Sequence, residues 1–481
     1  MKMRPGSPTG FLLCGKEWNE GEALEVRSPW DQSLVGQVTV PSRADARQAV
    51  QHAVASLRRT RGLPRWKRSE ILENVAAALI EQKERFAQLI VAEAGKPVRM
   101  ARAEVDRAIL TFKTAAEEAV RLGGESIPLD LTEGNENRWG LVQRFPVGPV
   151  LAITPFNFPL NLVAHKAAPA MAAGCPILIK PAPQTPFTAL ALGEVILKAG
   201  WPEEALAVLP LSNVDAAWLA EKEDRIKLLS FTGSARVGWE LKVNSGRKRV
   251  LLELGGNAAL IVHNDWPDLD AAAAKTAHAA FGFAGQSCIS VQRVFVERRV
   301  FQSFLWKVVD VTGKMPSGNP ADEATEVGPM VRLGEAERVE LWIKEALESG
   351  AKLVTGGKRH GSVVEPTILS GTQSGMKVRD EEVFGPVLII EPFDDFEQAL
   401  ADVNHSKYGL QAGLLTRDAG RILTAYRELE VGALIVGDTP SWRLDPMPYG
   451  GVKESGLGRE GIRSAIQEMT EPRMLVMAGL S

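Results

Sequence analysis

The sequence predicts an α/β protein with two domains in tandem, each built around a parallel sheet. Short apolar runs alternate with helix-like segments in residues 148–256, and a second series of the same kind follows. This alternation is typical of parallel βαβ units. The length agrees with two large domains and a smaller unit, because the 481 residues exceed what one core holds, at roughly 150 residues per domain.

The expected elements follow in order along the chain. Residues 42–122 carry apolar side chains at steps of three and four, as in Ile71, Val75 and Leu79, which predicts helices. The first series of expected strands comprises residues 150–154, 177–179, 207–209, 226–230 and 250–252. The second series comprises residues 258–262, 293–296, 352–354, 387–390 and 433–436.

Two segments lie outside both series. Residues 124–145 form a polar, extended stretch, and residues 473–477 have the composition of a strand. Strands that belong to neither sheet expose unpaired backbone groups. We therefore expect them to pair across subunits of a symmetric oligomer.

Composition excludes several classes of protein. Hydrophobic residues make up 45% and charged residues 24%, as in soluble globular proteins. The 56 basic and 59 acidic side chains give a net charge of −3, which indicates neither a nucleic-acid nor a membrane partner. The longest apolar stretch, residues 167–179, contains two prolines and a glycine, and it is shorter than the roughly 20 residues that cross a bilayer.

The short N-terminal apolar run and the spacing of the cysteines predict a cytoplasmic protein. The apolar run at residues 11–14 is too short for the core of a signal peptide. The three cysteines, Cys14, Cys175 and Cys288, are an odd number at wide spacing. This pattern fits a reducing compartment rather than a disulfide framework.

Cys288 is the strongest candidate for chemistry. Small neighbours in residues 281–292, together with Gln286, are expected to leave the sulfur approachable. Glu253 stands upstream in the segment Leu-Leu-Glu-Leu-Gly-Gly. A thiol that attacks a carbonyl and a carboxylate that activates water form a two-step catalytic pair. The alternative for Cys288 taken alone is a small buried core residue.

The Cys288 thiol needs activation to serve as a nucleophile. An unperturbed cysteine is only about 3% ionised at pH 7. We expect a helix N-terminus or a nearby cation to remove this deficit.

Other motifs are weaker. The Gly-x-Gly-x-x-Gly pattern at residues 456–461 lacks a preceding strand and a following acidic residue, so it is interpreted as a turn and helix start. Gly233 and Ser234 lie where a strand is expected to end and a helix to begin, which favours a phosphate site or an ordinary helix cap. The six histidines show no spacing typical of metal ligands, so no metal is expected. No serine-hydrolase elbow occurs.

Seven motifs in a fixed order resemble the aldehyde dehydrogenase superfamily over nearly the whole chain. They are Pro-Phe-Asn-Phe-Pro at 155–159, Ile-Lys-Pro-Ala at 179–182, Phe-Thr-Gly-Ser at 231–234, Glu-Leu-Gly-Gly at 253–256, Gly-Gln-Ser-Cys at 285–288, Glu-Val-Phe-Gly-Pro at 382–386 and Pro-Tyr-Gly-Gly-Val-Lys-Glu-Ser-Gly at 448–456.

The resemblance implies two Rossmann-like α/β domains, one nucleotide-binding and one catalytic, plus a small β oligomerisation element. Residues 1–122 and 146–254 would form the nucleotide-binding domain, and residues 255–450 the catalytic domain. Residues 123–145 and 465–481 would be oligomerisation strands of a homodimer or homotetramer. The implied nucleotide site needs no glycine fingerprint, which explains the unused pattern at 456–461.

The resemblance also implies roles for individual residues. Cys288 would be the nucleophile and Glu253 the base that activates the deacylating water, while the Asn157 amide and the Cys288 N–H would bind the oxyanion. Lys166 and Glu460 would relay protons from the base. The cofactor, NAD or NADP, would contact Lys180 at the adenosine ribose, Gly233 and Ser234 at the pyrophosphate, Glu382 at the nicotinamide ribose, Phe384 beside the nicotinamide, and also Thr154, Pro155 and Phe156.

Cofactor choice is open because of one departure from the family pattern. Members that prefer NAD often carry a glutamate three residues after the ribose-binding lysine, and this chain has Pro183 there. Without a carboxylate to repel a 2′-phosphate, we expect use of both cofactors with a lean towards NAD.

Three reaction outcomes are distinguished by the same residues. The coenzyme-A-acylating branch usually lacks the base and has arginine before its cysteine, whereas this chain has Glu253 and Ser287. Hydrolysis to a carboxylic acid is therefore favoured over acyl transfer to coenzyme A. A catalytically silent relative would need a blocked pocket, because Cys288, Glu253 and Asn157 are all present.

The aldehyde itself is expected to contact a short set of side chains, namely Phe156, Asn161, Ile289, Trp442 and Arg443. If Arg443 faces the pocket, it would recognise an anionic aldehyde, such as a phosphonate, a sulfonate or a hydroxy-acid semialdehyde. The alternative is a solvent-facing arginine in a loop.

Overall fold

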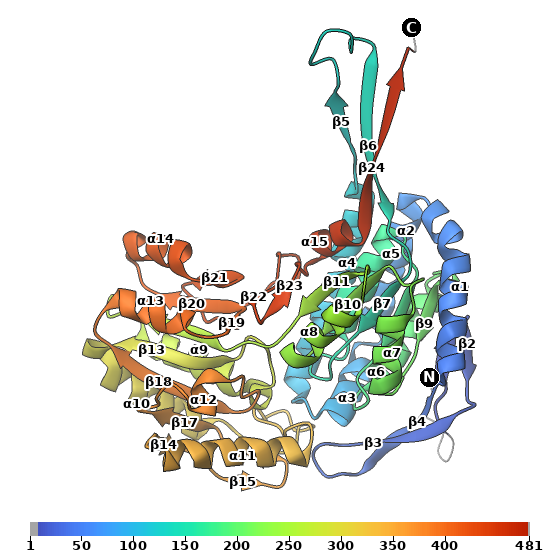
Figure 1. Ribbon diagram of the computed structural model, residues 1–481. Helices are drawn as coiled ribbons and strands as arrows, with labels where there is room; N and C mark the ends of the chain where they lie inside the picture. Colours follow the sequence, from blue (N-terminus) through green and yellow to red (C-terminus); the bar gives the residue numbers. More distant parts are fainter. Residues whose placement is uncertain (1–7, 480–481) are drawn as a thin grey trace.

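The computed structural model describes residues 8–479 and contains two large sheets and a projecting arm (Figure 1). The first sheet has the order β2 (Lys16–Trp18), β1 (Phe11–Leu13), β9 (Leu206–Val208), β8 (Ile177–Lys180), β7 (Val150–Ile153), β10 (Leu228–Thr232), β11 (Arg249–Glu253) and β23 (Gly456–Leu457). The central strands from β9 to β11 are parallel, as the sequence predicts. The outer strands β1, β2 and β23 run antiparallel to their neighbours.

Helices cover both faces of this sheet. They are α1 (Arg43–Gly62), α2 (Arg65–Glu81), α3 (Lys83–Ala94), α4 (Val98–Arg121), α5 (Asn161–Ala173), α6 (Pro186–Lys198), α7 (Asn213–Lys222) and α8 (Ala235–Asn244), with a 3-10 turn at Glu203–Ala205. One hydrophobic core joins a sheet face to α2 through α6, and a second core joins the opposite face to α1, α7 and α8. Burial on both faces explains why these strands are continuous apolar runs.

The second sheet has the order β14 (Lys352–Thr355), β17 (Thr367–Ser370), β18 (Val387–Phe393), β13 (Val291–Glu297), β12 (Ala258–Val262), β20 (Gln411–Leu415) and β21 (Ala433–Val436). Its helices are α9 (Leu269–Phe281), α10 (Arg298–Lys314), α11 (Leu333–Glu348), α12 (Lys377–Asp380), α13 (Phe396–Asn404) and α14 (Ala419–Glu428). The fold is therefore the predicted pair of Rossmann-like α/β layers.

Three details of the second sheet differ from the sequence prediction. β14 pairs antiparallel with β17, whereas the other pairs are parallel. β17 and β20 were not predicted, because turn-forming residues flank β17 and Gly413 interrupts the apolar run of β20. A small hairpin of β15 (Arg359–His360) and β16 (Val363–Val364) occupies the connection between β14 and β17.

The projecting arm contains the segments that lie outside both predicted series. β5 (Glu125–Pro128), β6 (Arg138–Pro146) and β24 (Thr470–Ala478) form one antiparallel sheet that extends away from the body (Figure 1). Trp139, Leu475 and Val476 on this arm are at least half exposed. A further hairpin joins β3 (Glu22–Arg27) to β4 (Leu34–Val40). Within residues 8–479, no helix combines the length and the apolar character that crossing a membrane requires.

Residues 443–461, here called the crossing segment, pass between the two large sheets and end in the Gly-x-Gly-x-x-Gly pattern (Figure 1). β22 (Val452–Lys453) pairs with β19 (Tyr408–Gly409), and β23 pairs with the end of β11. A short strand therefore does precede the pattern, contrary to the sequence reading, but Gly461 leads into α15 (Ile462–Glu468) as the predicted helix start. Gly456 of the crossing segment pairs with Glu253, and Arg443, Tyr449 and Glu460 line the same cavity as Glu253.

Candidate active site

A cavity of about 650 Å³ lies between the two large sheets. One wall follows the carboxyl ends of β7, β10 and β11, where ligands usually bind in open parallel sheets. The other wall comes from residues that precede β13 and β18, together with the crossing segment. Cys288, Glu253, Asn157 and Glu460 all line this cavity, so the chain brings together four of its five predicted catalytic side chains.

The turn before Cys288 has an unusual backbone. Phe283, Ala284 and Gly285 have φ angles of 52°, 53° and 68°. These angles lie in the left-handed region, which residues other than glycine seldom adopt. Gln286 holds this turn in place, because its buried amide donates to the Phe283 and Pro329 carbonyl oxygens, each at 3.2 Å, and accepts from the Val331 N–H at 2.8 Å. Gln286 therefore fixes the backbone of the turn before Cys288.

The Cys288 sulfur lies close to a phenol. Its Sγ is 3.0 Å from the Tyr449 hydroxyl oxygen, and the residue is partly exposed to the cavity. Burial raises the pKa of the thiol to about 11, while the Tyr449 hydrogen bond and Arg443 oppose the shift. Of the two expected activating groups, no helix begins at Cys288, because β13 (Val291–Glu297) follows it, whereas the cation Arg443 does act on the thiol. The thiol is therefore neutral in this state.

Asn157 lies on the cavity wall in a loop that hydrogen bonds fix. Its Nδ2 donates to the Gln286 carbonyl oxygen at 2.9 Å, which leaves the second N–H of that group for another acceptor. Its loop is tied down by Glu104, which accepts from the Leu160 and Asn161 N–H groups at 2.9 and 3.1 Å. The amide is therefore positioned by its bond to the Gln286 carbonyl and by the Glu104 bonds that follow it in the loop.

Glu253 ends β11 and is buried, and its Oε2 has no hydrogen-bond partner. Burial raises the pKa of Glu253 well above its usual range, and the nearby Glu460 carboxylate raises it further. The backbone beyond Glu253 runs close to the cysteine, since a Cβ added to Gly256 would lie 2.2 Å from the Cys288 carbonyl oxygen. A carboxyl group with a raised pKa beside a cavity suits a general base.

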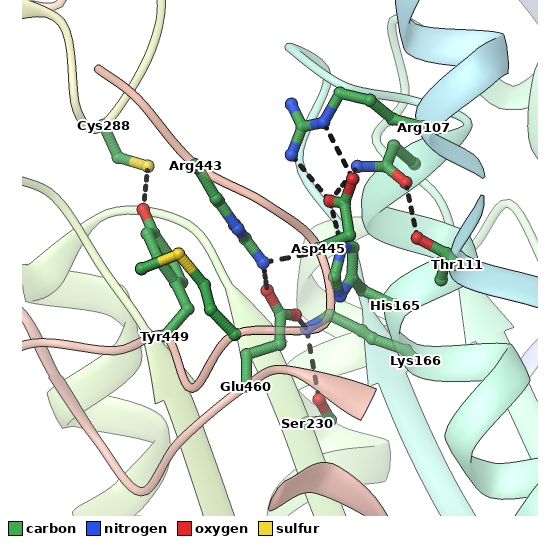
Figure 2. Close-up of polar contacts among 12 residues, drawn as sticks. Arg107, Thr111, His165, Lys166, Ser230, Cys288, Arg443, Asp445, Tyr449 and Glu460 are labelled. Carbon is green, nitrogen blue, oxygen red and sulfur yellow. Dashed lines mark hydrogen bonds and ion pairs between the residues drawn. The ribbon is translucent and has the colours of Figure 1, made fainter. Parts of the chain in front are cut away.

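Lys166 and Glu460 form a buried chain with Arg443 (Figure 2). Lys166 Nζ lies 3.1 Å from Ser230 Oγ and 3.3 Å from Glu460 Oε1. Arg443 donates to Glu460 Oε2 at 3.0 Å. These cations keep the pKa of Glu460 below its usual range despite burial. The two carboxyl groups are thus shifted in opposite directions: the pKa of Glu253 is raised and the pKa of Glu460 is lowered.

Arg443 faces the cavity rather than solvent. Its side chain is only 6% exposed, lines the cavity and stacks on the Tyr449 ring, with 3.6 Å between the guanidinium carbon and the ring centroid. Phe156, Asn161 and Ile289 line the cavity as predicted. Trp442 is not among the lining residues, and its side chain is 49% exposed.

Sequence reasoning missed a second arginine. Arg107 lines the cavity from α4 and forms two hydrogen bonds with Asp445, at 2.7 and 3.1 Å. His165 is fully buried and contacts the same carboxylate at 2.7 Å (Figure 2). No local motif marks these residues, since the bonded partners are separated by 338 and 280 positions in the chain.

Comparison with known proteins agrees with this geometry. The model of the aldehyde dehydrogenase family matches residues 17–475. The chain belongs to this family.

Several members are similar over almost their whole length. A 3-sulfolactaldehyde dehydrogenase from Priestia aryabhattai is 45% identical, covering 97% of this chain and 98% of the relative. The crystal structure of aldehyde dehydrogenase 21 from Physcomitrella patens, in complex with the reaction product succinate, is 40% identical with a TM-score of 0.96, covering 98% and 99% of the two chains. The NADP complex of a glyceraldehyde-3-phosphate dehydrogenase from Methanocaldococcus jannaschii is 35% identical with a TM-score of 0.92, covering 96% and 100%.

This aldehyde dehydrogenase uses NAD or NADP, and one end of the cavity fits such a cofactor. Ser234 begins α8 without a side-chain capping bond, so the first N–H groups of the helix are not satisfied by that side chain. Gly233 and Ser234 line the cavity together with Pro155, Phe156, Glu382 and Phe384. Glu382 accepts the Gly256 N–H at 2.8 Å, and burial raises its pKa to about 7.

Two predicted cofactor residues lie outside the cavity lining. Lys180 ends β8, donates to Asn213 Oδ1 at 2.7 Å and is buried, which lowers its pKa to about 8. Thr154 follows β7, is buried, and its hydroxyl has no partner. An unpartnered buried hydroxyl and a buried amine beside the parallel sheet are groups that a bound nucleotide would satisfy.

Proposed function

We propose that Cys288 is the nucleophile of this aldehyde dehydrogenase and that Glu253 is the base that activates water for hydrolysis of the thioester. The observation that carries this proposal is the shared cavity, in which the sulfur, the Asn157 amide and the unpartnered Glu253 oxygen all border one space. Bound NAD(P)⁺ supplies the hydride acceptor and a positive charge in the cavity.

The first half of the reaction would form a thiohemiacetal on Cys288, and loss of its hydride to the cofactor would leave a thioester. The Asn157 Nδ2–H and the Cys288 backbone N–H would stabilise the oxyanion, each by about 3 kcal/mol as in comparable oxyanion holes. Because burial raises the pKa of the thiol to about 11, the protonated form predominates at pH 7. Arg443 and the Tyr449 hydroxyl favour the thiolate, and a further cation beside the sulfur would lower its pKa.

The second half would hydrolyse the thioester to a carboxylic acid. Glu253 would accept a proton from water, since its raised pKa makes it a stronger base than an exposed carboxylate. Glu460 and Lys166 would then take part in moving that proton away from the buried site, because they form a continuous hydrogen-bonded chain with Ser230. The buried base favours water over coenzyme A as the acyl acceptor.

The substrate class proposed is an aldehyde that carries a second, anionic group. Arg443 and Arg107 line the cavity, and carboxylates and sulfonates are suitable partners for a planar guanidinium. Arg443 Nε is buried and has no partner in the described chain. The names of the similar proteins support this class, because sulfolactaldehyde and succinate both carry such an anion.

We expect Arg443→Gln to impair oxidation of an anionic aldehyde selectively. Succinate semialdehyde and butanal have equal chain lengths and differ in the terminal carboxylate. The ratio of their kcat/KM values should fall by about 100-fold, because the variant loses one charge-assisted contact. Trp442→Ala, in the same loop but outside the cavity, is the control and should leave the ratio unchanged. An equal loss for both aldehydes would contradict an anion-binding role.

The proposed tolerance of NADP depends on Pro183, three residues after Lys180. Pro183→Glu should raise the KM for NADP by about tenfold through repulsion of the 2′-phosphate, with little change for NAD. Pro183→Gln separates the charge from the change of shape and should leave both values close to those of the parent. A parent enzyme that already prefers NAD by more than about 100-fold would refute the expectation.

We further propose that the enzyme is a cytoplasmic homodimer or homotetramer assembled through the arm of β5, β6 and β24. The exposed apolar side chains on this arm, including Trp139 and Leu475, support a partner surface. The cysteines Cys14, Cys175 and Cys288 are all free thiols, which fits a reducing compartment. Light scattering of the purified enzyme measures the mass, and a monomer would exclude this assembly.

A further inference from the structure

Tyr449 occupies an unusual position between the nucleophile and the substrate arginine. Its hydroxyl oxygen lies 3.0 Å from Cys288 Sγ, and its side chain is buried against Ile289 and Leu410. The same ring carries the Arg443 guanidinium at 3.6 Å on one face (Figure 2). One side chain therefore contacts both the reacting sulfur and the cation proposed to hold the substrate anion.

The backbone fixes Tyr449 in this position. Its N–H donates to the Glu460 carbonyl oxygen at 2.9 Å, and the Glu460 N–H donates back to the Tyr449 carbonyl oxygen at 2.6 Å. The Glu460 side chain in turn binds Arg443. This closed set of contacts leaves the phenol little freedom to turn away from the sulfur.

When the Cys288 thiol is ionised, the Tyr449 hydroxyl is the donor of the hydrogen bond between them. Burial and the adjacent Cys288 raise the pKa of Tyr449 well above its usual range, so the phenol keeps its proton. The charged groups that act on Cys288 are Arg443, Glu382 and Glu253, and the two carboxylates disfavour a thiolate. The Tyr449 hydroxyl is thus one of two groups that offset burial and the carboxylates.

We propose that Tyr449 is a positioning residue whose hydroxyl donates a hydrogen bond to the Cys288 thiolate while its ring holds Arg443 at the substrate end of the cavity. This rests on the proposed role of Cys288 as the nucleophile. The two functions are separable, because phenylalanine removes only the hydroxyl and leucine removes both the hydroxyl and the aromatic face.

Alkylation by iodoacetamide tests the hydroxyl without requiring turnover. The rate at the Cys288 peptide is followed by mass spectrometry across a pH series below the pKa of the thiol. In Tyr449→Phe, alkylation at each pH should be about tenfold slower than in the parent, because a hydrogen bond to a charged group is lost. Cys14, which lies outside the cavity, is the internal reference and should react at an unchanged rate. An unchanged or faster rate at Cys288 would overturn the proposal.

A second substitution provides a test in the opposite direction. Site-specific 3-fluorotyrosine at position 449 keeps the shape of the side chain and makes the phenol a stronger donor, so Cys288 alkylation should become faster than in the parent. This test remains decisive if Tyr449→Phe does not fold. A slower or unchanged rate would overturn the proposed donor role.

Steady-state kinetics separate the ring from the hydroxyl. Tyr449→Phe should lower kcat and leave the KM for succinate semialdehyde nearly unchanged, whereas Tyr449→Leu should also raise that KM, because Arg443 loses its stacking surface. Equal KM values in the two variants would overturn the ring's part. If the parent oxidises no aldehyde while the alkylation rates still differ as expected, the proposed function fails and the hydrogen bond to the sulfur stands.

Discussion

Replacing Cys288 by alanine is expected to lower the rate of aldehyde oxidation by at least about 10⁴-fold while leaving the fold and cofactor binding intact. Without the sulfur, no tetrahedral adduct forms from which hydride can leave, and the remaining donors around Asn157 have no oxyanion to stabilise. The measurement is the absorbance of the reduced cofactor, with NAD or NADP and a panel of aldehydes that includes succinate semialdehyde.

Cys14→Ala is the matched control for this substitution. Cys14 is a free, partly exposed thiol outside the cavity, and its variant should keep the activity of the parent. Residual activity of Cys288→Ala within tenfold of the parent would refute the role of the sulfur. Absence of turnover in the parent itself, with any aldehyde of the panel, would instead indicate a catalytically silent member of the family.

Local patterns in the sequence were sufficient for most of the parallel strands. β7, β8 and β10 to β13 are apolar runs between helices, and burial on both faces gives such runs directly. The antiparallel direction of β14 could not be predicted, because a hairpin rather than a helix connects it to β17. β20 was missed because its Gly413 interrupts the apolar run, and a Cβ there would lie 2.8 Å from a Leu260 side-chain atom.

The motifs led to Cys288, Glu253 and Asn157, whose positions at strand ends and turns follow from local sequence. Contacts between distant segments could not be inferred in the same way. Tyr449 meets Cys288 across 161 positions of the chain, although both lie in motifs that were recognised. The thiol pKa also differs from the expectation, because burial outweighs the nearby cation. Burial depends on the complete tertiary structure, which no short motif contains.

Replacing Glu253 by glutamine is expected to separate the two halves of the reaction. One equivalent of reduced cofactor per active subunit should appear in a burst, and the steady rate should then fall by about 10² to 10⁴-fold, because the amide cannot accept a proton from water. Intact mass spectrometry of the stalled enzyme should show an acyl group on Cys288. Glutamine preserves the size of the side chain, so loss of packing is a small part of the change.

The steady rate of the parent enzyme should also depend on pH through Glu253. Because burial and Glu460 raise the pKa of Glu253, the base is active above that raised pKa and is lost as the pH falls through it. The steady rate of the parent should therefore rise with pH across the raised pKa, and the glutamine variant should lack this rise. Added coenzyme A or another thiol should release the stalled acyl group by thioester exchange. If Glu253→Gln gives no burst, the carboxylate acts before hydride transfer, and its assignment to hydrolysis alone is wrong.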